Sequence, residues 1–387
     1  MSRPPLGSTL SLFGFDIAWY SLLMMVSVAL GIRLAMREEK RLRLPPDTVV
    51  DFALFAVPLG IVGARLYYVA FTFHRFSGNW LDIFRTWNGG LAFYGAILGG
   101  LLAAVIVSKR SKVPLTALMD VAAPSLAIAQ AIGRWGNYAN MEAYGARIYS
   151  EAAQFFPLAV EIRLVGAGGT EFWYWHMATF FYEFAWLLVV FAVLMRGRRG
   201  MPVSGDVAWW YLLLYGAGRT VIEGLRDDSL MLNVSAAQVR VSQLLSAVLC
   251  VAVLVLFFLR IVRAGRKPRI PDCLCAAIAL LGIACTFVGE FERNAYQTLF
   301  TLAQWLLAGL LALDVLLLVI YTVRARRFSK MSAGMLSLIA LSGLTLALGI
   351  GRLGAGNTAF IALRQSVAMA HLLLAGAWYY LRGTPKR

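Results

Sequence analysis

The chain has 387 residues, of which 60% are hydrophobic and only 14% are charged. This composition is typical of a polytopic membrane protein and argues against a soluble globular enzyme. The formal net charge is +16, but the basic residues stand in short clusters between apolar segments, so the charge indicates membrane topology rather than nucleic-acid binding. The three histidines are scattered and the four cysteines lie in or beside apolar segments, so we expect neither a metal site nor a cofactor.

Eleven apolar segments divide the chain, each long enough to cross a bilayer with some tilt. They predict an all-α fold of about eleven transmembrane helices. The predicted limits are 14–36, 51–73, 89–108, 115–133, 173–195, 206–223, 241–260, 272–289, 297–322, 332–350 and 365–381.

Alternate connections between these segments are basic. Lys and Arg accumulate in loops on the cytoplasmic side of a membrane. An odd number of spans with the N-terminus outside and the C-terminus in the cytoplasm places every basic loop on that side. The basic clusters follow segments one, three, five, seven and nine and the last segment, at residues 33–43, 109–112, 196–199, 260–269, 324–330 and 382–387.

A short linker, RKPRIPD at residues 266–272, predicts a division of the chain into two parts. The front part, residues 1–265, holds seven spans, and the back part, residues 272–387, holds four. The longest connection, at about residues 134–172, follows the fourth span and is predicted to lie outside the cytoplasm.

The stretch AIGRWGNYANMEAYG, residues 131–145, places polar side chains where the fourth span should leave the membrane. It carries Arg134, Asn137, Asn140 and Glu142 beside three glycines, one of them Gly145. An Arg at mid-helix costs about 2.5–3.5 kcal/mol on insertion scales, so such a cluster needs partners. Two interpretations stay open at this point: a pocket for an anionic lipid headgroup, and a helix cap with a snorkelling Arg.

Three further polar groups occur at membrane depth. Arg65 lies inside the second segment, and the glycine-rich run at 87–100 includes Gly89 and Gly90. These glycines suit close helix packing, which is a sufficient explanation for most of them, and they also leave room for a ligand.

The third group is YGAGRTVIEGLRDD, residues 215–228, in which Arg219 and Glu223 are four residues apart on one helix face with Arg226 nearby. An ordinary surface ion pair is the alternative explanation. However, ionisable groups within a membrane span are functional by default. The predicted topology puts the ends of segments four and six on the outer side, so Arg134 and Arg219 are expected to meet at one cavity. Two arginine forks suit phosphate oxygens.

The sequence resembles the prolipoprotein diacylglyceryl transferases over roughly residues 10–260. The matching segments come in the family's order and include FDIAWYSLL, GARLYYV, WNGGLAFYG, GRWGNYANMEAYG, TFFYEFAW and YGAGRTVIEGLRDDS. The resemblance implies a seven-span membrane enzyme that moves the diacylglyceryl group of phosphatidylglycerol onto the lipobox cysteine of a prolipoprotein. It implies no nucleic-acid partner, and it implies a bacterial inner-membrane location with the active site facing outward.

The polar clusters and the resemblance together predict the site residues. We expect catalytic roles for Arg134, Arg219, Glu142, Glu223 and Tyr94. We expect substrate-binding roles for Asn137, Asn140, Gly145, Tyr20, Arg65, Gly89, Gly90 and Arg226. The two arginines would stabilise charge on the leaving phosphate, and Glu142 and Glu223 would orient them or accept the thiol proton.

The sequence departs from the family pattern in two places. Tyr94 stands where many members have a histidine, and Tyr is a poor base, so we expect it to position substrate or relay a proton. In the run that aligns Thr179, Tyr182 and Glu183 with the family, His176 is displaced by one residue. A divergent transferase with another acceptor and a non-catalytic lipid-binding or transport protein therefore remain as alternatives.

Overall fold

The computed structural model describes most of the front part of the chain and one helix near its C-terminal end. The described residues are 9–12, 15–76, 78–86, 89–165, 169–201, 203–227, 231–234, 237–267, 272–273, 276–277, 280 and 356–383. The helices are α1 (Trp19–Leu42), α2 (Thr48–Phe71), α3 (Phe93–Arg110), α4 (Leu115–Ala139), α5 (Thr179–Gly197), α6 (Asp206–Leu225), α7 (Val241–Arg263) and α11 (Gly356–Gly383).

Short elements fill the connections between the helices. Three antiparallel hairpins pair β1 (Thr9–Leu12) with β2 (Phe15–Ala18), β3 (Ala159–Val165) with β4 (Glu171–Met177), and β5 (Met231–Val234) with β6 (Ala237–Arg240). The 3-10 turns are η1 (Phe73–Phe76), η2 (Trp80–Phe84), η4 (Glu151–Ala153) and η5 (Arg198–Gly200).

Within the described residues, six helices are long and apolar enough to cross a membrane, namely α1 to α5 and α7. The chain is therefore a mostly helical, multi-pass membrane protein. The helix α6 matches the predicted sixth span, and α11 contains the predicted last one. The predicted spans 297–322 and 332–350 lie outside the described residues, and so does most of 272–289.

Helix boundaries differ from the prediction at three places that matter for the site. The helix α1 begins at Trp19 rather than near residue 14, because the preceding residues pair as β1 and β2. The helix α4 continues to Ala139, so Arg134 and Asn137 lie on its last turns instead of in the loop that follows. The predicted fifth span begins as strand β4, and its helix starts only at Thr179.

The chain divides into two compact units. The smaller unit comprises Val28–Leu126, and the larger unit comprises Met1–Ser27 and Ala127–Arg387. In the smaller unit, α2 and α3 pack along each other, and buried Gly95 and Gly99 of α3 allow the two backbones to approach closely.

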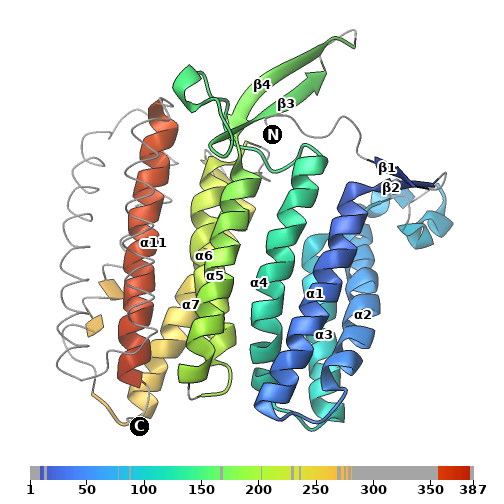
Figure 1. Cartoon of the computed structure of the whole chain (residues 1–387). Helices are drawn as coiled ribbons and strands as arrows, with labels where there is room; N and C mark the ends of the chain where they lie inside the picture. The colour runs from blue at the N-terminus through green and yellow to red at the C-terminus, as the bar shows by residue number, and fades with distance from the viewer. Residues whose placement is uncertain are drawn as a thin grey trace. The chain divides into compact units, whose positions relative to one another are not determined.

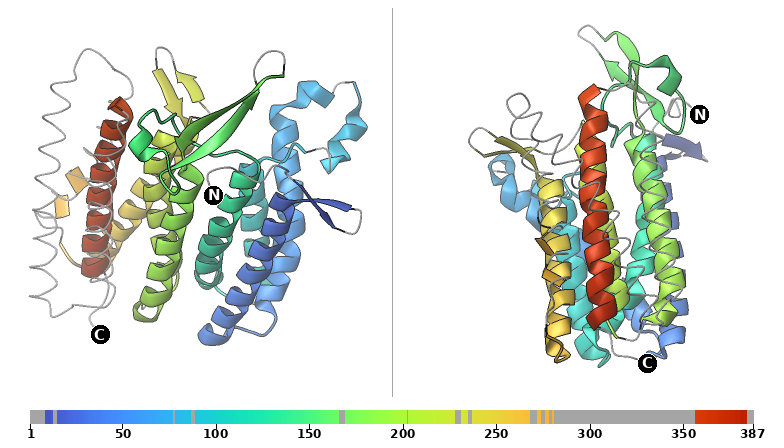
Figure 2. Two further views of the ribbon diagram at one scale, coloured as in Figure 1. Left: turned by 45° about the horizontal axis from the view of Figure 1, so that its top comes forward. Right: turned by 90° about the vertical axis from the view of Figure 1, so that its left-hand side faces the viewer.

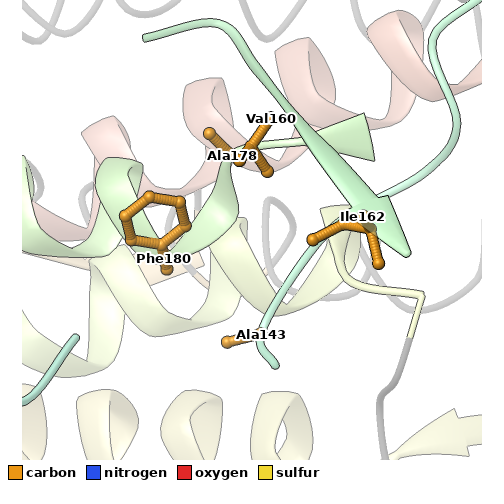
Figure 3. Close-up of a cluster of buried hydrophobic side chains, with 5 residues drawn as sticks. All are labelled: Ala143, Val160, Ile162, Ala178 and Phe180. Carbon is orange, nitrogen blue, oxygen red and sulfur yellow. The ribbon is translucent and has the colours of Figure 1, made fainter. Parts of the chain in front are cut away.

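In the larger unit, α6 packs against α5, α7 and α11 (Figures 1 and 2). The strands β3 and β4 form a hairpin that continues directly into α5 at its N-terminal end (Figure 1). The hairpin is anchored by a buried apolar cluster of Ala143, Val160, Ile162, Ala178 and Phe180 (Figure 3). This cluster joins the chain that leaves α4 to the start of α5.

The helix α11 is fixed to the first turn of α6 by buried polar contacts. The Tyr380 hydroxyl donates to Asp206 Oδ2 at 2.7 Å, and Arg260 of α7 pairs with Oδ1 of the same carboxylate. Asp206 is fully buried, so it needs both partners. These contacts lie at the end of α6 opposite Arg219 and Glu223.

Candidate active site

Two buried carboxylates hold three arginines where α4, α5 and α6 meet. Glu183 bridges two of the arginines, with Arg134 Nη2 2.6 Å from its Oε1 and Arg219 Nη1 donating to its Oε2 at 2.8 Å. Glu223 Oε2 lies 2.7 Å from Arg219 Nη2 and 3.6 Å from Arg226 Nη1. These five residues are called the arginine cluster below. The predicted meeting of Arg134 with Arg219 is confirmed by their shared contact with Glu183, and so is the pairing of Arg219 with Glu223. The cavity expected between them stays a prediction.

The chain direction explains why these residues meet. Arg134 lies in the last two turns of α4, Glu183 in the second turn of α5, and Arg219 in the last two turns of α6. Because α5 runs antiparallel to α4 and α6, the start of α5 lies at the same level as the ends of α4 and α6. Four-residue spacing then stacks Glu223 over Arg219 on one face of α6.

The arginine cluster is largely closed off and carries an excess of positive charge. The side chains of Glu183 and Glu223 are 3% and 2% exposed, and those of Arg134 and Arg219 are 18% and 12% exposed. Three guanidinium groups face two carboxylates, so the formal charge of these five side chains is +1. Planar guanidinium forks match the oxygens of a phosphate.

Two hydrogen bonds connect Arg134 to an exposed rim of the site, which Asn140 and Glu142 form just after α4. Arg134 Nη1 donates to Asn137 Oδ1 at 3.2 Å, and Asn137 Nδ2 donates to Glu142 Oε2 at 3.4 Å. Asn140 and Glu142 are both exposed at this rim. Glu142 was expected to orient the arginines, but the carboxylate in that position is Glu183. Glu142 reaches Arg134 through Asn137 instead.

Gly145 holds the segment after α4 against α5 and α6. Its N–H donates to Met177 O at 2.9 Å, and the Thr179 hydroxyl donates to Ala143 O at 2.6 Å. A Cβ on Gly145 would lie 2.7 Å from Leu225 O and 2.8 Å from Met177 Cβ, which is too close for any side chain. The absence of a side chain thus allows residues 143–146 to lie between the start of α5 and the end of α6. We call residues 143–146 the strap.

Tyr20 packs on α4 at Gly136. A Cβ on Gly136 would lie 2.6 Å from Tyr20 Cδ2, so this glycine makes room for the ring. The Tyr20 side chain keeps 38% of its surface exposed. The substrate-binding role predicted for Tyr20 stays a prediction.

Arg65, in the smaller unit, donates to backbone carbonyls. Its Nε donates to Ile83 O at 2.7 Å, and its Nη1 donates to Gly89 O at 2.7 Å and Gly90 O at 2.9 Å. Its Nη2 donates to the carbonyls of Asp82 and Arg85. All five N–H groups of the guanidinium are thereby used. We therefore propose that Arg65 shapes the loop after η2, including Gly89 and Gly90, rather than touching substrate itself.

Both glycines of this loop have a left-handed backbone, with φ of 85° at Gly89 and 74° at Gly90. A Cβ on Gly90 would also lie 2.6 Å from Arg65 Nη1. Tyr94 follows at the start of α3, where its ring is 6.3 Å from that of Tyr67 and 6.1 Å from that of Phe93. The role predicted for Tyr94 thus stays a prediction.

A family model described as prolipoprotein diacylglyceryl transferase matches residues 8–259. The chain belongs to the prolipoprotein diacylglyceryl transferase family. Its curated relatives include proteins named phosphatidylglycerol–prolipoprotein diacylglyceryl transferase. The one from Streptococcus equi subsp. equi is 39% identical over 247 residues, which is 63% of this chain and 91% of the relative. Those from Streptococcus pneumoniae and Enterococcus faecalis are 42% and 41% identical over 235 and 252 residues, covering 60% and 64% of this chain and 86% and 88% of the relatives.

The family match includes every residue of the arginine cluster, and it ends close to the last residue of α7. The matched region also includes Glu183. The sequence analysis aligned this residue with the family but did not predict it as a site residue. The clue in the sequence is a single acidic residue at the start of an otherwise apolar span. Among the described residues, no three His, Cys, Asp or Glu side chains gather as they would around a metal ion.

Proposed function

We propose that the chain transfers the diacylglyceryl group of phosphatidylglycerol to the thiol of a prolipoprotein lipobox cysteine, forming a thioether and releasing glycerol phosphate. The observation that carries this proposal is the arginine cluster, which gathers three guanidinium groups where α4 and α6 end and α5 begins. The cluster lies in a chain whose curated relatives are named for this transfer.

In the proposed reaction, the cysteine sulfur attacks the carbon of the diacylglycerol unit that bears the phosphate oxygen. The C–S bond forms as the C–O bond breaks, and its electron pair leaves with the phosphate. A free thiol has a pKa of about 8.5, so a thiolate is accessible near neutral pH with modest help. Arg134 and Arg219 would stabilise the charge that grows on the leaving phosphate, and electrostatic stabilisation of this kind commonly contributes most to an enzyme's rate enhancement.

The contacts support separate roles for the three carboxylates. Glu183 lies between Arg134 and Arg219 and would keep both forks directed at the phosphate. Glu223 would hold Arg219 and Arg226. Glu142 lies at the rim and reaches the arginine cluster through Asn137, so it is the carboxylate best placed to accept the thiol proton. Tyr94 keeps the positioning or relay role proposed from the sequence.

The reaction is tested with purified full-length protein in detergent, phosphatidylglycerol and a lipobox peptide. We expect the peptide to gain a diacylglyceryl group on sulfur, with one glycerol phosphate released per thioether. A peptide with Ser in place of the cysteine should gain nothing. Folded protein that binds phosphatidylglycerol but forms no thioether would instead indicate a non-catalytic lipid-binding protein. Transfer to another acceptor alone would indicate a divergent transferase.

We further propose eleven spans in the bacterial inner membrane, with the N-terminus outside, the C-terminus in the cytoplasm and the arginine cluster facing outward. The basic ends of the helices support this orientation. Arg196 lies in the last turn of α5, and Arg198 and Arg199 follow it, at the end away from Glu183. Arg260 and Arg263 lie in the last turn of α7. Such clusters favour the cytoplasmic side.

We also propose that residues 1–265 form the catalytic core and that residues 272–387 form an added membrane module outside the catalytic centre. In support, the family match ends at residue 259, and α11 contacts the end of α6 opposite the arginine cluster. A chain ending at Lys267 should retain measurable thioether formation, although we expect it to be less stable because Asp206 loses Tyr380. A truncated chain that is folded but inert would contradict this division.

A further inference from the structure

The helix α6 carries further polar side chains at four-residue spacing before Arg219, on the side of the arginine cluster that is deeper in the proposed membrane. Tyr211, Tyr215, Arg219 and Glu223 follow one another at this spacing, so they lie along one face of the helix. The rings of Tyr211 and Tyr215 stack with centroids 5.8 Å apart. The polar face of α6 therefore extends about 12 Å deeper than Arg219, as the 1.5 Å rise per residue gives over eight residues.

The helix α4 repeats this arrangement one turn below Arg134. Gln130 precedes Arg134 by four residues and lies on the same face of α4. The Tyr211 hydroxyl donates to Gln130 Oε1 at 2.9 Å, so α4 and α6 are joined by a second polar contact at this depth. Tyr211 is buried, whereas Gln130 is only half-buried.

This contact uses the oxygen of the Gln130 amide and leaves its N–H groups to donate elsewhere. Because Tyr211 donates to the amide oxygen, the amide NH₂ group points away from Tyr211, and none of the described residues accepts from it. An amide donor at membrane depth without an acceptor costs free energy that a ligand acceptor would recover. Gln130 lies about 6 Å below Arg134, from the rise of four helical residues. In a glycerophospholipid, the ester carbonyls lie on the hydrocarbon side of the phosphate, one glycerol unit away.

We propose that Gln130, held by Tyr211, donates a hydrogen bond to an ester carbonyl of the lipid donor whose phosphate lies at the arginine cluster. This inference rests on the proposed function and extends it from the headgroup to the acyl linkage. Gln130 is then a substrate-binding residue that distinguishes ester-linked from ether-linked lipids, because an ether lacks the carbonyl oxygen. Tyr211 is a positioning residue that fixes the orientation of the amide.

The test compares diester phosphatidylglycerol with its diether analogue of equal chain length, in thioether formation on a lipobox peptide. For the wild-type protein we expect kcat/KM to be about three- to tenfold higher with the diester, the value of one neutral hydrogen bond. Gln130→Met should lower the diester rate to the diether rate and leave the diether rate unchanged. Tyr211→Phe should shift the ratio in the same direction by a smaller factor. Gln154→Met, which removes an amide that bonds Ile148 O outside the spans, should leave the ratio at its wild-type value.

The outcomes separate this inference from the proposed function. Wild-type protein that forms no thioether from either donor contradicts the function itself. Thioether formation with an ester-to-ether ratio that Gln130→Met leaves unchanged overturns the subsite, and so does equal use of both donors by the wild type. A merely structural Gln130 would lower both rates by the same factor. If Gln130→Met fails to fold, as judged by thermal unfolding in detergent, the ratio in Tyr211→Phe decides the question.

Discussion

Glu183 is the side chain that joins Arg134 and Arg219. Its carboxylate is 3% exposed and contacts both Arg134 and Arg219. Removing one partner of a buried ion pair leaves the others uncompensated and costs about 3–5 kcal/mol. We therefore expect Glu183→Gln to lower the free energy of unfolding in detergent by about that amount, and to abolish most thioether formation.

Glu171→Gln is the matched control for this prediction. Glu171 pairs with Arg163 on the β3–β4 hairpin, where both side chains are exposed, so its loss should cost less than about 1 kcal/mol. Equal stability of the two variants would show that Glu183 does not bridge the arginines.

The sequence predicted which arginines gather at the site better than it predicted the contacts that hold them. Arg219 and Glu223 are four residues apart, so helix geometry alone predicted their contact. The meeting of Arg134 with Arg219 followed from the alternation of spans. The contact of Glu183 with both arginines could not be derived in the same way, because it depends on the rotation of α5 relative to two other helices. Nor could the sequence show that the donors of Arg65 are taken up by carbonyls, since that depends on the path of a loop.

At the scale of elements, the strap joins three helices, and its glycine is the position that permits this. Gly145→Ala should place a methyl group against Leu225 O and Met177, forcing the strap away from α6. We expect a loss of about 1–3 kcal/mol, the usual cost of overpacking, together with reduced thioether formation. Thermal unfolding and activity in detergent measure both effects.

Gly133→Ala provides the comparison, on the neighbouring helix α4. A Cβ there would find Met24 Sδ at 3.8 Å, an ordinary van der Waals contact, and alanine is the better helix former. This variant should be as stable as the wild type or more so. If Gly145→Ala proves equally harmless, the strap is not fixed as described.

The loop between η2 and α3 depends on Arg65 in the same manner. Lys in place of Arg65 offers three donors on a single nitrogen, so it cannot reach the five carbonyls that the planar guanidinium serves. We expect Arg65→Lys to raise amide hydrogen exchange at residues 82–90 while exchange in α5 and α6 stays unchanged. Unchanged exchange in the loop would mean that Arg65 does not hold it.

The helices themselves were predictable because apolar length is a strong and local property. The predicted spans 206–223 and 241–260 begin at the same residues as α6 and α7. The errors fall where polar chemistry interrupts the apolar pattern. The helix α4 extends through Arg134 to Ala139, because the Arg134 side chain finds partners in Glu183 and Asn137. The aromatic residues at 173–175 pair as a strand, although their hydrophobicity alone was typical of a span.

At the scale of the whole molecule, the proposed orientation makes a simple prediction about reporter fusions. Fusions after residues 110, 165, 198 and 267 should report the cytoplasm, the outside, the cytoplasm and the cytoplasm, in that order. The reason is that Lys and Arg resist translocation. An outside signal at 198 or 267 would contradict the orientation and, with it, the outward-facing arginine cluster.

The proposed function depends on phosphate binding by the guanidinium forks of Arg134 and Arg219 during transfer. Its direct test is the rate of thioether formation on a lipobox peptide with phosphatidylglycerol, at matched amounts of folded protein, for Arg134→Lys and Arg219→Lys. Lys keeps the charge but not the fork, so we predict that each rate falls by about a hundred- to thousandfold. Arg163→Lys, on the exposed hairpin, should react at the wild-type rate. Rates near wild type for both Arg134→Lys and Arg219→Lys would contradict the phosphate-binding role.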